Sequence, residues 1–140
     1  NWTFTPKLSF QMYIQPYFST GIYSGIKELA QPGTFSFKYY GEGNSSISRT
    51  DNVYSIDPDG AGESPSFTLS NPDFNYKSLR ANAVLRWEYL PGSTLYFVWT
   101  NQKVDLVNNG EFNFGSDLRT LLNVQPDNVF SIKITYWLDP

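Results

Sequence analysis

The chain has 140 residues, enough for one domain at most, and its 13 acidic against 10 basic side chains leave a formal charge of −3. That balance offers no basic surface for a phosphate backbone, so we expect no nucleic-acid partner. The sequence contains neither Cys nor His, which excludes disulfides, thiolate metal sites and histidine-based catalysis. We therefore expect no enzyme activity from these residues.

Four segments alternate between apolar and polar residues with a period of two, which predicts β-strands whose two faces meet different surroundings. Each is close to the length of ~10 residues that a tilted strand needs to cross a bilayer. The N-terminal Trp2 to Thr5 reads as the end of a further strand, which suggests that the chain is a segment of a longer polypeptide. The four segments are Leu8 to Gln15, Ser78 to Tyr89, Thr94 to Gln102 and Val129 to Leu138.

The connections between these segments are of two kinds. Thr5-Pro6-Lys7 and Leu90-Pro91-Gly92-Ser93 are short reversals with turn-forming residues. Residues 16–33, 41–77 and 103–127 are expected to be long loops, with a helical turn over 24–30, weak strands near 35–40 and 52–56, and a helix over 117–122. Alternation of short turns with long loops is typical of outer-membrane barrels.

The two faces of the predicted strands have the composition that such a barrel needs. The polar face would turn Arg80, Asn82, Arg86, Glu88 and Lys133 toward a hydrated lumen. The apolar face carries rings near the strand ends, at the level where interfacial aromatic residues form girdles. These membrane-interface aromatics are Trp87, Tyr89, Trp99 and Tyr136.

Several motifs together point to a known family. Asn71 to Arg80 (NPDFNYKSLR), Asn82 to Tyr89 (NAVLRWEY), Pro91 to Leu95 and Val98-Trp99 are its most specific parts, and Asn128 to Leu138 agrees. The chain resembles the C-terminal barrel region of a large Bacteroidota family of unknown function. In that family a carbohydrate-binding-module-like sandwich of the family nine type precedes an outer-membrane β-barrel. The resemblance implies a bacterial outer-membrane location and a link to glycans, and it carries over no catalytic residues.

The loop Asp57-Pro58-Asp59-Gly60-Ala61-Gly62-Glu63 has three carboxylates, and oxygen ligands at alternate positions suit Ca²⁺. Turn-forming residues of this type also make ordinary solvated turns, and Pro58 stiffens the segment. We expect Asp57, Asp59 and Glu63 to face solvent without a metal, and we expect no cofactor.

The sequence predicts an all-β antiparallel transmembrane barrel segment, the C-terminal strands of a larger barrel. It would act as a membrane scaffold or passage that displays external loops. Its partners would be the lipid bilayer, further strands from the same or other chains, and a glycan. The alternative is a soluble carbohydrate-binding β-sandwich, which has half-buried strands of the same kind. Four clear strands are too few to close a barrel, so the last strand should pair with Thr94 to Gln102 on one side and with a strand outside residues 8–138 on the other.

Overall fold

The computed structural model describes residues 1–138, and it divides the chain into two compact units. Unit 1 contains residues 1–19, 76–106 and the chain from Phe112 on, and unit 2 contains Thr20–Asn75 and Val107–Glu111. The sequence had suggested one barrel segment with loops. The difference arises because residues between the long strands of the five-stranded sheet form small sheets of their own.

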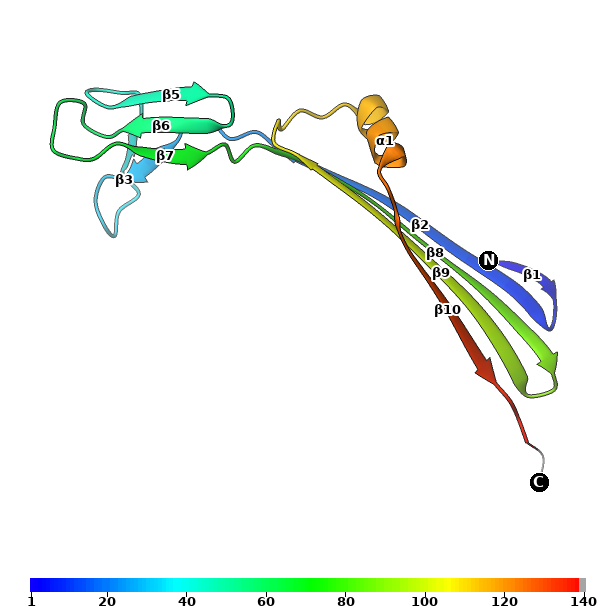
Figure 1. Cartoon of the computed structure of the whole chain (residues 1–140). Helices are drawn as coiled ribbons and strands as arrows, with labels where there is room; N and C mark the ends of the chain where they lie inside the picture. The colour runs from blue at the N-terminus through cyan, green and yellow to red at the C-terminus, as the bar shows by residue number, and fades with distance from the viewer. Residues whose placement is uncertain (139–140) are drawn as a thin grey trace. The chain divides into compact units, whose positions relative to one another are not determined.

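Unit 1 is built on one five-stranded antiparallel sheet in the order β1-β2-β8-β9-β10 (Figure 1). All four alternating segments are strands, as predicted, but three of them run further than the alternation indicated. The strands are β1 (Trp2–Thr5), β2 (Leu8–Gly21), β8 (Phe74–Leu90), β9 (Ser93–Val107) and β10 (Asp127–Thr135). The last strand thus ends before Tyr136, three residues earlier than expected.

The register of β10 matches the prediction on the side where this chain supplies the partner. β10 is antiparallel to β9, from Asp127 opposite Gln102 to Thr135 opposite Thr94. At the other end of the sheet, β1 is paired only with β2. Among residues 1–138 the sheet is therefore open, with β1 and β10 as its edges, and the pairing of β10 with an outside strand stays a prediction.

Two tight turns lie at one end of this sheet. One is Pro6-Lys7 between β1 and β2, and the other is Pro91-Gly92 between β8 and β9. Gly92 has φ +74°, a left-handed conformation that glycine adopts without strain. The Glu88 N–H donates to the Lys7 carbonyl over 2.7 Å, which brings the two turns to the same end.

Unit 2 contains a two-stranded sheet and a three-stranded sheet. The helical turn expected over residues 24–30 is wrong: Gly25 has φ +66°, which interrupts a helix, and the residues after it form a strand. The weak strands expected near 35–40 and 52–56 are present as β4 and β6, and β5 and β7 were not foreseen. The strands are β3 (Lys27–Leu29), β4 (Phe37–Tyr39), β5 (Ser46–Thr50), β6 (Val53–Asp57) and β7 (Phe67–Ser70).

Helix α1 (Phe114–Asn123) covers the predicted helix and begins one turn earlier. Asn113 caps it, because its side chain accepts from the Ser116 N–H over 3.1 Å. Leu121 is fully buried, whereas the next residue, Leu122, is 54 % exposed. No helix in residues 1–138 has the length and apolar character needed to cross a membrane.

Candidate functional site

The apolar face of the five-stranded sheet is formed by even-numbered residues of β2 and β10 and odd-numbered residues of β8 and β9. Residues directly opposite in an antiparallel pair share a face, and Phe97 is opposite Ile132 while Trp99 is opposite Phe130. A shallow hollow of about 430 Å³ is lined from all four strands, including Phe10 and Leu85. Ile132 remains 62 % exposed, so nothing in residues 1–138 covers this part of the face.

Aromatic rings occur toward both limits of the apolar face. Near the tight turns, the rings of Trp87 and Tyr89 meet edge to face with their centroids 6.2 Å apart. Toward the other end, the Trp99 Nε1–H donates to Asn128 Oδ1 over 2.9 Å, and the apolar residues give way to amides there. Tyr136 follows the end of β10 and is 62 % exposed.

The opposite, polar face carries the five residues expected to line a lumen. Arg86 Nη2 lies 3.5 Å from Glu88 Oε2 on β8, and both side chains are partly exposed. Such a pair adds little stability but keeps both charges solvated. Asn82 is exposed on the same strand, and Lys133 is exposed on β10, opposite Tyr96. Arg80 lies at a hollow, described next.

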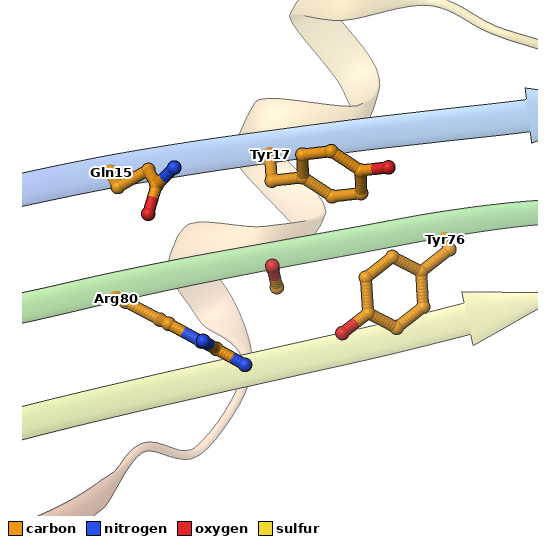
Figure 2. A pocket seen from close by; sticks show the side chains of 5 residues that line it. Gln15, Tyr17, Tyr76 and Arg80 are labelled. Atoms are coloured by element: carbon orange, nitrogen blue, oxygen red, sulfur yellow. The ribbon is translucent and has the colours of Figure 1, made fainter.

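The hollow beside Arg80 has a volume of about 230 Å³ and is lined by two neighbouring strands. Gln15 and Tyr17 reach it from β2, and Tyr76, Ser78 and Arg80 reach it from β8 (Figure 2). The two tyrosine rings meet edge to face with their centroids 6.0 Å apart. Helix α1 lies behind the sheet in Figure 2, so the hollow and α1 are on opposite faces.

The apolar face ends in a buried ionic cluster that sequence reasoning missed. Lys77 of β8 is 3 % exposed, and its Nζ lies 2.8 Å from Asp105 Oδ2 of β9 and 3.6 Å from Asp117 Oδ1 of α1. Asp117 Oδ2 also accepts from the Asn113 N–H over 2.9 Å. The cluster therefore ties α1 to two strands. One sequence feature could have revealed the cluster. Two charged residues, Lys77 and Asp105, stand at odd-numbered positions of β8 and β9, where the alternating pattern places apolar residues.

Unit 2 has its own buried polar group, which we call the neck: Asn71, Asp73 and Asn75 with their partners. Asp73 Oδ1 accepts from the Tyr23 N–H over 2.7 Å. Asn71 Nδ2 donates to the Asn108 carbonyl over 3.4 Å, and Asn75 Nδ2 donates to the Glu111 carbonyl over 2.5 Å. These three residues belong to the NPDFN motif on which the family resemblance depended, and here they hold backbone segments together.

The acidic loop of unit 2 uses its carboxylates on its own backbone. Asp57 Oδ1 accepts from the Gly60 N–H over 2.8 Å, and Asp59 Oδ2 accepts from the Ser64 N–H over 3.0 Å. Hydrogen bonds from the Ser64 backbone and hydroxyl hold the pKa of Asp59 below its ordinary value. Glu63 is exposed, and no three acidic side chains gather as a metal site in the part of the chain that the structure describes.

Tyr40 is a second titratable group of unit 2 with a perturbed environment. Desolvation, followed by the hydrogen bond from its hydroxyl to Glu28 Oε2 at 2.8 Å, raises the pKa of Tyr40. Its ring meets Phe67 edge to face with their centroids 5.8 Å apart. These aromatic contacts pack unit 2 internally.

One comparison decides the family. The model of the domain of unknown function DUF5916 matches residues 1–140, the whole chain. The chain belongs to this family. Neither a curated protein nor a solved structure matches it.

Proposed function

We propose that the five-stranded sheet of this DUF5916 chain is part of the wall of an outer-membrane β-barrel that acts as a scaffold or passage. The observation that carries the proposal is the apolar face shared by four strands and left uncovered within residues 1–138. A water-exposed apolar surface of this continuity is unfavourable for a soluble monomer. Hydrocarbon would cover it without a second protein layer.

The polar face supports the same orientation. Arg80, Arg86, Glu88 and Lys133 all lie on the side away from Phe97 and Ile132, so a hydrated lumen would solvate every charge while lipid contacts none of them. A shift of one residue in the pairing of β9 and β10 would reverse this arrangement. The observed register therefore agrees with a lipid-facing and a lumen-facing side.

The lengths of the connections between strands suggest how the sheet is oriented across the membrane. The turns Pro6-Lys7 and Pro91-Gly92 are at one end, and the segments that form unit 2 and α1 leave from the other ends of the strands. Outer-membrane barrels have short periplasmic turns and longer extracellular connections. We therefore assign the tight turns to the periplasmic side and the long connections to the extracellular side. A glycan is the partner that the resemblance suggests for this surface.

The competing proposal is a soluble carbohydrate-binding β-sandwich. It requires a second sheet to cover Phe97, Phe130 and Ile132, and none of residues 1–138 supplies one over these side chains. Another chain or segment would then have to do so. The two proposals differ in what touches the apolar face, and this difference can be measured.

The test uses single cysteines carrying nitroxide labels in the full-length protein, because this chain contributes no cysteine of its own. Ile132→Cys and Phe97→Cys place labels on the apolar face, and Lys133→Cys and Tyr96→Cys are their matched neighbours on the polar face. In native membranes we expect oxygen, which partitions into lipid, to accelerate the spin relaxation of the labels at positions 97 and 132. A water-soluble nickel chelate should accelerate the spin relaxation of the labels at positions 96 and 133.

Two results would contradict the membrane proposal. One is equal access of the nickel chelate to both pairs of labels. The other is a protein that stays monomeric in buffer without detergent, with the Ile132 and Phe97 labels shielded from oxygen and nickel alike, as a sandwich core would shield them.

A further inference from the structure

We propose that the hollow at Arg80 binds a hexuronic acid, with the guanidinium holding its carboxylate and the two tyrosines holding its ring. The inference deepens the passage role and rests on the proposed function for its location inside the barrel. The hollow itself is formed entirely by residues of β2 and β8 in unit 1.

The charge of Arg80 gives the first part of the argument. Arg86 on the same strand is already paired with Glu88, whereas Arg80 has no hydrogen bond or ion pair within residues 1–138. A guanidinium presents several donors in a planar fork that matches a carboxylate in two-point contact. An anionic oxygen pair is thus the group that the hollow lacks.

The other lining residues suit a polyhydroxylated ring. Tyr17 and Tyr76 offer ring surface and a hydroxyl each, and their edge-to-face arrangement presents two differently oriented walls (Figure 2). Gln15 and Ser78 add donors and acceptors for ring hydroxyls. A simple aliphatic acid would use Arg80 alone and leave these groups to water.

The size of the hollow limits the ligand to one ring. Its volume of about 230 Å³ is below the roughly 300–1,000 Å³ of pockets for drug-sized ligands. A second hollow of about 380 Å³ also borders Arg80, with Asn82, Thr100 and Gln102 on its other sides. A ring could therefore move from one hollow to the other while its carboxylate stays near Arg80, as passage along a wall requires.

The experiment measures binding of glucuronate to the full-length protein in detergent micelles by isothermal titration calorimetry. Glucose supplies the ring without the charge, and acetate supplies the charge without the ring. We expect saturable binding of glucuronate that is at least tenfold tighter than binding of either fragment. Arg80→Gln should weaken it about tenfold or more, since it removes the charged partner of the ligand's carboxylate.

The matched control is Arg119→Gln, which removes the same charge from an exposed position on α1. Arg119→Gln should leave the affinity for glucuronate unchanged. The double variant Tyr17→Phe/Tyr76→Phe should weaken the binding of glucuronate and leave the binding of acetate unaffected. Far-UV circular dichroism checks that each variant is folded. Absence of saturable glucuronate binding, equal affinity for acetate, or equal loss in Arg119→Gln would each overturn the inference. None of these results alters the nitroxide test of the apolar face, so failure of the site and failure of the barrel proposal are distinguishable.

Discussion

The Lys77 side chain is almost completely buried. A buried ammonium group is stable only when oppositely charged groups lie beside it. Asp105 of β9 and Asp117 of α1 lie within ion-pair distance of the Lys77 Nζ, so two different elements supply its partners. Replacing a buried ion pair by apolar residues can be neutral, but removing one partner leaves an unpaired charge behind. The attachment of α1 therefore depends on this single lysine more than on any exposed residue of the helix.

Lys77→Met should loosen α1, because an uncompensated buried charge costs about 3–5 kcal/mol. We expect trypsin to cut after Arg119 at least about tenfold faster, as local opening becomes easier. Mass spectrometry of the fragments measures the rate. Lys7→Met, in an exposed turn, is the control, and adding Asp105→Asn to Lys77→Met should restore part of the resistance. Unchanged cleavage in Lys77→Met would contradict the role of the cluster.

The lowered pKa of Asp59 determines how the acidic loop of unit 2 should respond to pH. Its pKa is lowered from 3.8, so the ionised carboxylate stabilises the folded loop above its unfolded pKa, and this stabilisation is lost as pH falls through the lowered pKa. The Ser64 amide resonance should therefore shift with a midpoint below 3.8 in an NMR titration. Asp59→Asn should abolish the shift and Glu63→Gln should retain it. A midpoint at or above 3.8 in the unmodified protein would exclude the hydrogen bonding described.

β9 shows most clearly how one strand presents two environments, because its successive residues alternate between the two faces over its whole paired length. Leu95, Phe97 and Trp99 lie on the apolar side, and Thr94, Tyr96 and Val98 lie on the other. Adjacent residues of this strand are thus natural matched pairs for substitution.

Phe97→Arg and Tyr96→Arg should differ sharply in a membrane. An arginine on the lipid side near the midplane costs about 2–4 kcal/mol, whereas a lumen position tolerates it. We expect Phe97→Arg to reduce the amount of folded, heat-modifiable full-length protein in outer-membrane fractions, and Tyr96→Arg to leave it near normal. Equal loss for both substitutions would argue against a lipid-facing side.

The strands show which parts of the fold could be read from sequence. Period-two alternation located the paired cores of β2, β8, β9 and β10, because a sheet with two unlike faces imposes that period. It did not predict that β2 continues through Pro16. Beyond Phe10 the outer edge of β2 has no partner in residues 1–138, and an edge strand accommodates a proline.

The candidate sites were less predictable for a similar reason. Arg80, Arg86, Glu88 and Lys133 could be assigned to one face from spacing alone. The hollow beside Arg80 depends on which residues of β2 come next to β8, and that register is set by long-range pairing. The cluster at Lys77 and the neck at Asp73 join residues far apart in the chain, which no local pattern reports.

The five-stranded sheet of unit 1 is curved, and its two edge strands, β1 and β10, differ in length (Figure 1). β10 is paired along its whole length with β9, and its other edge presents backbone donors and acceptors without partners in residues 1–138. An exposed edge of this length is a site for pairing with another strand. In the proposed barrel that strand would come from outside residues 8–138.

Hydrogen exchange can detect this partner. In an antiparallel strand paired on one side only, alternate amides point away from the neighbour. In the assembled full-length protein we expect every amide from Val129 to Thr135 to be protected, including those that point away from β9. Rapid exchange at every second residue of β10 would mean that the edge is free and the barrel is not closed there.

The neck of unit 2 has a consequence for the order in which the sheet assembles. Between the end of β2 and the start of β8 lie about 50 residues, and closing so long a flexible loop costs about 3.5 kcal/mol plus a constant. Within unit 2, however, the Tyr23 backbone is bonded to Asp73, and a Cβ on Gly21 would already touch the Phe74 ring. If the local hairpins of unit 2 form first, the chain ends that they bring together are those from which β2 and β8 extend. The connection of about 50 residues then slows folding no more than a short turn would. The pairing of β2 with β8 can start at the strand ends next to the neck and proceed as fast as the pairing in an ordinary hairpin.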